Sequence, residues 1–232
     1  MGDRVLNGLR GSLIITGTVL LGGCLLVLID SMVFQASLAH RLAAYGPWGE
    51  QATRAAIART NRLEAERSGL VGRIEIPRIK LSAMVLEGVS GHALQRGVGR
   101  VPGTAFPGEP GNIGLAGHRD TYFRRLSDVR PGDHIRLVTP GGAFTYEAES
   151  LLVVDPARVD VLAKGRANLT LVTCFPFAWV GPAPRRFVVL ARETDGKSRD
   201  RAAEVRHEDR FGGTRRGIDV SASAPGRPGP AE

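Results

Sequence analysis

The sequence predicts a mostly β domain, either a closed barrel or a sandwich, that follows an N-terminal membrane-spanning helix. Three observations carry this prediction. The chain of 232 residues contains 30 glycines and 14 prolines against 6% aromatic residues, a balance typical of many turns and short strands. Seven strand-like runs, separated by turn signals, lie between residues 71 and 192. One long uncharged run lies close to the N-terminus.

The uncharged run comprises the nineteen residues between Arg10 and Asp30. A helix of that length rises about 28 Å, close to the thickness of the hydrocarbon layer of a bilayer. Arg4 and Arg10 precede the run, so the positive-inside tendency predicts a single-pass anchor over residues 1–35, with a cytoplasmic N-terminus and an extracytoplasmic domain. A cleaved signal peptide is the alternative because residues 37–39 form a small-x-small site, but the run is longer than a usual signal h-region.

Two segments flank the predicted domain, which covers residues 69–193 and is long enough to bury a core. Residues 36–68 are predicted to form a helical stalk, because the stretch from residue 50 on lacks Gly and Pro and stops at Gly69. A flexible linker is the alternative. Residues 194–232 mix charges of both signs with Gly, Pro and Ser, which predicts a disordered polar tail.

Within the domain, short runs of strand formers alternate with turn signals, such as the Arg-Pro-Gly-Asp sequence at residues 130–133. Little helix is expected between the strands, which favours a barrel or a sandwich over a helical bundle. The predicted strands are residues 71–76, 84–88, 112–118, 133–138, 143–154, 169–174 and 186–192.

The formal net charge of +8 is spread thinly along the chain, and aromatic residues do not interleave with the basic ones. A surface that binds nucleic acid gathers its charge into a stripe or a stacking platform. Nucleic acid is therefore not an expected partner, and attraction to an anionic envelope surface is the simpler interpretation.

The chemistry begins with an unpaired thiol. The two cysteines are Cys24, inside the apolar run, and Cys174, in the exported domain, so the predicted topology keeps them apart. A leftover cysteine in an exported protein suggests a reactive thiol. Cys174 ends a strand-like run and is followed by Phe175-Pro176, which sets it at a strand end beside a loop, where functional sites are often built. A small buried side chain is the alternative.

A thiol nucleophile needs a proton acceptor, and of the five histidines only His118 ends a second strand-like run. A guanidinium can supply two fixed donors to an oxyanion, and Arg185 and Arg186 open the last strand, just beyond the loop after Cys174. Alternation does not choose between these two arginines, because both rows of that strand are largely apolar. No cluster of residues has metal-site spacing, so neither a metal nor a cofactor is predicted.

The stretches GEPGNIGLAGHRDTYFRRL and TLVTCFPFAWVGPAPRRFVV resemble the sortases, with class D as the nearest subtype. The resemblance covers roughly residues 69–193 and includes the opening GRIEIPRIKL. It implies the eight-stranded sortase β-barrel. The family's nucleophile falls on Cys174 and its histidine on His118, 56 residues earlier. Its arginine directly precedes the apolar core of the last strand, which selects Arg186 over Arg185.

The resemblance further implies a membrane-anchored cysteine transpeptidase. Cys174 would attack the Thr carbonyl of an LPXTG-like sorting signal on an exported protein, Arg186 would hold the oxyanion, and His118 would protonate the leaving amine. The thioacyl enzyme would then react with an amine acceptor at the cell envelope. Hydrolysis by water on the same scaffold is one alternative. A non-catalytic envelope binding module is another, although the presence of all three residues argues against it.

Overall fold

The computed structural model describes residues 2–45, 53–162 and 168–194, so the predicted tail from residue 195 onward lies outside the described residues. Eight strands are present in this part of the chain: β1 Leu70–Ile76, β2 Leu81–Glu87, β3 Val98–Arg100, β4 Ile113–Ala116, β5 His134–Thr139, β6 Gly142–Val154, β7 Leu169–Phe175 and β8 Arg185–Glu193. The helices are α1 Gly2–Ala43, α2 Arg54–Ser68 and α3 Gly91–Arg96, with 3-10 turns η1 Pro77–Ile79, η2 Arg124–Asp128 and η3 Val159–Leu162.

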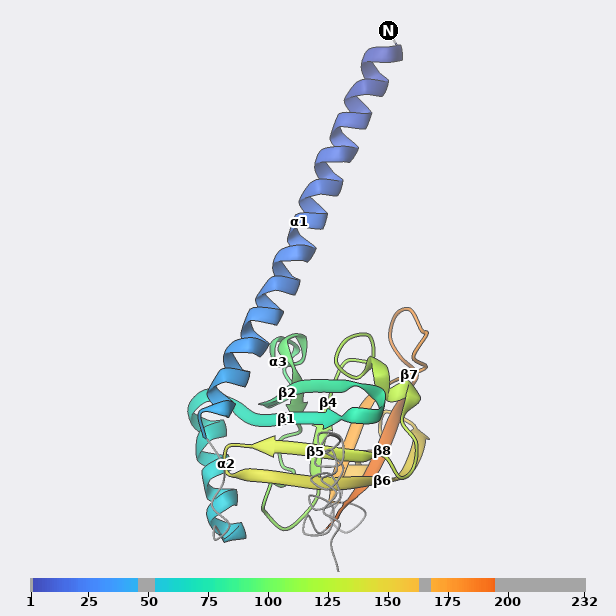
Figure 1. Ribbon diagram of the computed structural model, residues 1–232. Helices are drawn as coiled ribbons and strands as arrows, with labels where there is room; N and C mark the ends of the chain where they lie inside the picture. Colours follow the sequence, from blue (N-terminus) through green and yellow to red (C-terminus); the bar gives the residue numbers. More distant parts are fainter. Residues whose placement is uncertain (1, 46–52, 163–167, 195–232) are drawn as a thin grey trace, which may run out of the picture. The chain divides into compact units, whose positions relative to one another are not determined.

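The eight strands close into one barrel in the order β1-β2-β3-β4-β7-β8-β6-β5 (Figure 1). The β2–β3 and β4–β7 pairs are parallel and the other neighbouring pairs are antiparallel. Closure leaves no free sheet edge, which removes the risk of edge-to-edge aggregation. The mostly β class and the eight-stranded barrel are confirmed, and the sandwich is excluded.

The strand that sequence patterning missed is β3, which has three residues and a glycine at its centre. A Cβ atom on Gly99 would lie 2.3 Å from the carbonyl oxygen of Gly88, so only glycine permits this approach of the two backbones. A run this short carries no periodicity of its own. β2 also begins at Leu81, three residues before the predicted start at residue 84.

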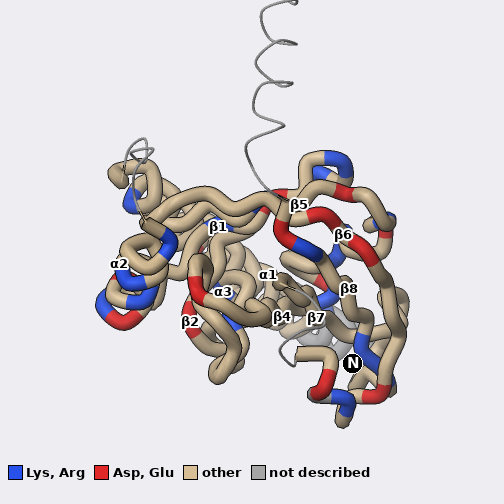
Figure 2. Tube along the Cα trace, turned by 90° about the horizontal axis from the view of Figure 1, so that it is seen from below, with Lys and Arg blue, Asp and Glu red and all other residues tan. Residues whose placement is uncertain are grey.

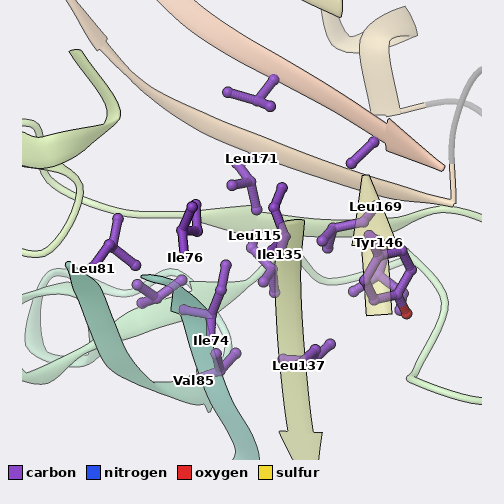
Figure 3. Packing of buried hydrophobic residues seen from close by; sticks show 14 of the residues in the cluster. Ile74, Ile76, Leu81, Val85, Leu115, Ile135, Leu137, Tyr146, Leu169 and Leu171 are labelled. Carbon is purple, nitrogen blue, oxygen red and sulfur yellow. The ribbon is translucent and has the colours of Figure 1, made fainter. Parts of the chain in front are cut away.

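The barrel interior is filled by alternate residues of the strands. Leu169 and Leu171 of β7 belong to the central hydrophobic cluster, as do Ile74 and Ile76 of β1 (Figure 3). Each of these side chains is fully buried, and burying a side chain of that size stabilises a fold by roughly 1.5–3 kcal/mol. The intervening residues of β7 face outward, where Val172 packs on a separate small cluster with Val188 of β8.

The barrel has two ends with different surroundings. We call the end at which β4 and β7 finish and β8 begins the thiol end, because it carries Cys174. The opposite end, which holds the β5–β6 turn and the loop between β3 and β4, is the α2 end. In Figure 1 the loop between β7 and β8 and the helix α2 lie at opposite sides of the barrel.

Helix α2 covers part of the α2 end and corresponds to the predicted stalk helix. Its first turn is capped by the Thr53 side chain, which accepts from the Ala56 N–H, and it stops at Gly69 in the left-handed region (φ 73°). Ala58, Asn61 and Ala65 are buried, which at this spacing is one face of the helix.

Basic and acidic residues are interspersed along the chain rather than gathered into one stripe (Figure 2).

Helix α1 is long and apolar enough to cross a membrane over Ser12–Ala43. The large apolar side chains between Leu13 and Val33 are exposed. The helix continues past the predicted boundary at residue 35, and its last turns contact the outside of the barrel. Gln35 Oε1 accepts from Met84 N–H of β2 at 2.9 Å, and Leu38 is buried in this contact.

Candidate active site

Cys174 and Arg186 are direct cross-strand partners in the antiparallel β7–β8 pair. Directly opposite residues of such a pair have Cα atoms about 4.5–5.5 Å apart and carry their side chains on the same face. Both side chains are partly exposed, so the sulfur is not sealed in the core. Phe175 at the end of β7 pairs with Arg185 at the start of β8. The loop between these two strands therefore starts and ends beside the site.

His118 follows the neighbouring strand β4, which runs parallel to β7. Each of the four register pairs between these strands joins residues that are 56 positions apart, from Ile113 with Leu169 to Ala116 with Val172. The ladder continues for one more bond, from Gly117 N–H to the Val172 carbonyl at 3.2 Å. The separation between His118 and Cys174 is the same 56 residues, so the register brings the two residues side by side at the thiol end.

Alternation along β8 separates the two candidate arginines. Val188 and Leu190 pack on the outer cluster and Val189 and Ala191 on the central one, so even-numbered residues of this strand face outward. Arg186 therefore shares the outer face with Cys174, whereas Arg185 belongs to the opposite row. The two arginines therefore lie on opposite faces of β8, and Arg186 is the one on the face of Cys174.

A buried threonine ties the two strand ends together. The Thr173 hydroxyl donates to the Gly117 carbonyl oxygen at 2.7 Å, and Thr173 is only 2% exposed. Gly117 has no room for a side chain, because a Cβ atom there would lie 2.8 Å from the Phe123 ring. Beyond it, the His118 carbonyl accepts the Phe123 N–H at 3.0 Å, so the chain turns back directly after the histidine. These contacts fix the backbone of Gly117 and His118 at the end of β4, next to the end of β7.

The guanidinium of Arg186 is anchored by the backbone and not by an acid. Its Nη1 donates to the carbonyl oxygens of Ala183 at 3.2 Å and Arg185 at 3.0 Å. Within the described residues no carboxylate forms an ion pair with it. A carbonyl dipole orients a cation without neutralising it, so the guanidinium keeps its positive charge.

Sequence reasoning missed the part played by Arg119. This residue, next to His118, donates to three carbonyl oxygens of the loop that joins β7 to β8: Pro176 at 3.0 Å, Trp179 at 2.6 Å and Gly181 at 3.1 Å. No local pattern announces such contacts, because their partners lie 57 to 62 residues away in the sequence. At the base of the same loop Phe175, Phe177 and Phe187 form an aromatic cluster, with Phe177 and Phe187 centroids 5.3 Å apart.

A sizeable groove lies elsewhere on the molecule. It has a volume of about 710 Å³, lies at the α2 end between α2 and the loop at residues 108–111, and is lined by Arg59 and Tyr146 among others. Burial and the nearby Glu193 carboxylate raise the pKa of Tyr146 far above its ordinary range. None of the three sequence-predicted site residues lines this groove. The three residues lie instead at the thiol end.

A closed eight-stranded barrel whose rim brings together a thiol, an imidazole and a guanidinium defines the class of protein: a barrel of the sortase type. The Sortase domain model matches residues 74–194, just over half of the chain. The chain belongs to the sortase family.

Individual relatives agree with this assignment. The chain is 38% identical over 123 residues to Sortase D from Bacillus subtilis (strain 168), a match that covers 52% of this chain and 62% of the relative. It is 37% identical over 127 residues to Sortase SrtE1 from Streptomyces coelicolor, covering 44% and 35% of the two chains. The similarity to Sortase D confirms the resemblance to class D. This chain spans less than two thirds of the length of these curated relatives.

A solved structure gives the same fold. The crystal structure of sortase C1 from Streptococcus agalactiae superposes with a TM-score of 0.53 at 26% identity, over 64% of this chain and 80% of that chain.

Proposed function

We propose that this protein is a membrane-anchored cysteine transpeptidase that cleaves an LPXTG-like sorting signal and joins the product to an amine acceptor at the cell envelope. One observation carries the proposal: Cys174 and Arg186 are cross-strand partners on the outer face, and the β4–β7 register sets His118 on the other side of the thiol. Membership of the sortase family supports it.

The first half-reaction forms a thioester. The Cys174 thiolate attacks the backbone carbonyl carbon of the Thr residue in the sorting signal, and the carbonyl oxygen becomes an oxyanion. The Arg186 guanidinium donates hydrogen bonds to that oxyanion and balances its charge. The C–N bond then breaks, His118 gives its proton to the leaving amine, and the thioacyl enzyme remains.

The second half-reaction reverses the roles. An incoming amine loses a proton to His118 and attacks the thioester carbonyl. Its new C–N bond forms as the C–S bond breaks, and the thiolate of Cys174 is regenerated. The product is an amide, so the bond energy of the peptide is retained through the thioester.

The N-terminal helix supplies the location. We propose that residues 1–35 form a single-pass anchor with a cytoplasmic N-terminus, and that the barrel, over residues 69–193, works outside the cytoplasm. The support is the exposed apolar surface of α1 and the two arginines that precede its apolar stretch. Residues 36–68, with the end of α1 and all of α2, connect the two.

Cys174→Ala provides the direct test. Intact-protein mass spectrometry after incubation with a panel of sorting-signal peptides is expected to detect a thioacyl adduct on the wild type and none on the variant. Cys174 is partly exposed at a strand end, so the variant should keep its circular dichroism spectrum and thermal midpoint. An adduct that survives on a folded Cys174→Ala protein would reject Cys174 as the nucleophile.

Product analysis decides between transfer and hydrolysis. The transpeptidase is expected to give an amide product when a small amine such as triglycine is added, in competition with the free acid. A free acid as the sole product at every amine concentration would identify a thiol hydrolase on the same scaffold.

A further inference from the structure

The loop between β7 and β8, residues 176–184, connects the two strand ends that carry Cys174 and Arg186. Within the described part of the chain, residues 176–184 take part in no backbone-to-backbone hydrogen bond apart from those of the β7 and β8 strands themselves. Its tip is exposed, with Trp179 at 48% and Val180 at 97% exposure. A loop without such bonds depends on side chains for its conformation.

Two guanidinium groups and one indole satisfy carbonyl oxygens of the loop. Trp179 Nε1 donates to the Pro182 carbonyl at 3.0 Å, which closes the tip, and Arg186 Nη1 donates to Ala183. Arg119 provides the remaining three bonds, with Nη1 to Pro176 and Nη2 to both Trp179 and Gly181. These three carbonyls span the first two thirds of the loop, from the residue two positions after Cys174 to the far side of the tip.

Arg119 connects the segments that carry all three reactive residues. It directly follows His118 in the chain, and its guanidinium donates hydrogen bonds to the loop that starts after Cys174. The same loop leads into Arg186. We infer that Arg119 is a positioning residue, whose fork of donors fixes the β7–β8 loop and thereby the spacing of thiol, imidazole and guanidinium. This inference rests on the proposed function, because the spacing matters only if those three groups react together.

The planar guanidinium is the side chain that fits this task. Its donors diverge from one rigid plane and can serve three carbonyls, whereas the lysine ammonium is a compact point charge on a flexible stem. The carbonyls accept without neutralising the charge, and within the described residues no carboxylate pairs with Arg119. Arg119→Lys should therefore restore part of the loop order that Arg119→Ala removes.

Trp179 offers a direct readout of the loop. The chain has two tryptophans, Trp48 and Trp179, so Trp48→Phe leaves Trp179 as the single indole fluorophore. In that background, Arg119→Ala is expected to increase acrylamide quenching and lower the fluorescence anisotropy of Trp179. The rate of thioacylation at saturating peptide should fall about 10- to 100-fold, because small misplacements of reacting groups are costly. Arg119→Lys should lie between the wild type and Arg119→Ala in both measurements.

Arg124→Ala is the matched control. Arg124 belongs to the same connection after β4, is exposed and opens η2, and its removal takes the same charge from the same region. It should leave Trp179 quenching, the thioacylation rate and the thermal midpoint at wild-type values. Arg119→Ala should match it in thermal midpoint, since neither Arg119 nor the three residues whose carbonyls it contacts are buried, and differ from it in the other two measurements.

The outcomes separate this inference from the proposed function. If the wild type forms an adduct but Arg119→Ala equals Arg124→Ala in thioacylation, or leaves Trp179 quenching unchanged, the positioning role is overturned and the transpeptidase stands. A wild type that forms no adduct with any peptide overturns the proposed function, and the positioning role with it. If Arg119→Ala loses thioacylation, also lowers the thermal midpoint, and is not rescued by Arg119→Lys, Arg119 is a structural residue only.

Discussion

The arginines of the α2 end and the two arginines beside Cys174 and His118 have different kinds of partner. At the α2 end arginines face acids: Arg100, only 4% exposed, donates to both Glu87 oxygens at 2.6 Å, and Arg62 pairs with Glu109 at 2.5 Å. At the thiol end Arg119, which follows His118, and Arg186, which pairs with Cys174, donate to backbone carbonyls instead.

This difference separates structural charge from available charge. A buried cation paired with a carboxylate is neutralised locally and serves packing, as Arg100 does where it stacks 3.8 Å from the Phe106 ring centroid. A cation held by carbonyls keeps its field, which a substrate oxyanion can use. The comparison predicts that changes at Arg119 and Arg186 alter catalysis with little effect on stability, and that changes at residues held by ion pairs or buried hydrogen bonds do the reverse.

Arg186→Lys is expected to have the largest effect of the substitutions that keep the local charge. Loss of the guanidinium fork should slow thioacylation by about 100-fold or more, since a point charge cannot replace two fixed donors to the oxyanion. Arg185→Lys, on the opposite row of β8, should change the rate far less. Single-turnover thioacylation measured by mass spectrometry gives both numbers, and equal losses would move the site to Arg185.

Asn61→Leu tests the α2 end. Asn61 is fully buried, donates to the Pro107 carbonyl at 2.9 Å and accepts from Gly141 N–H at 2.8 Å. Its loss leaves two buried backbone groups unsatisfied, so the free energy of unfolding should fall by about 2–4 kcal/mol. Urea unfolding measures this loss, with the exposed neighbour Thr60→Ala as control. Thioacylation by the folded fraction should stay at the wild-type rate; a large loss there would couple the two ends.

Asp133 predicts an acid-sensitive contribution to stability. Hydrogen bonds from the Arg78 side chain, opposed by burial and aided by Arg130 N–H, hold the pKa of Asp133 below its ordinary value of 3.8. A carboxyl with a depressed pKa in the folded state stabilises the protein above its unfolded-state pKa and loses that contribution as pH falls below it. Asp133→Asn should cost about 1–3 kcal/mol at pH 7.

Thermal or urea unfolding of both proteins between pH 7 and pH 3 checks this expectation. The difference between the wild type and Asp133→Asn should be constant near neutrality and shrink as the pH falls through the acidic end of the range. A difference that grows in acid would contradict the lowered pKa.

Glu109→Gln should have the smallest effect. It removes the ion pair with Arg62 but retains an oxygen that can accept the Phe106 N–H, now held at 3.0 Å. Arg62 is half exposed, and such pairs contribute less than about 1 kcal/mol. The loss should also disappear in high salt, as unfolding with and without 1 M NaCl would reveal. A loss that persists in salt would identify a role for Glu109 beyond the pair.

Sequence patterning found most of the strands because turn signals and β-branched runs are local. It found seven of the eight, and it missed β3, whose three residues are held by pairing with β2 and by the glycine that lets the backbones approach. It predicted an anchor over residues 1–35 and did not say where the first helix ends, which is at Ala43. Gln35 and Leu38 contact the barrel and stabilise α1 beyond its apolar stretch. No local sequence pattern in that segment predicts these contacts.

The sequence by itself determined the residue types of the candidate site, since a cysteine at a strand end, a histidine at a second strand end and an arginine opening the last strand are local features. It could not state that the separation of 56 residues between His118 and Cys174 equals the offset between paired residues of β4 and β7. Nor could it state that Arg186 and not Arg185 shares a face with Cys174, or that Arg119 holds the β7–β8 loop. Only the tertiary structure decided these, because register and facing arise when strands far apart in the chain pair around a common core.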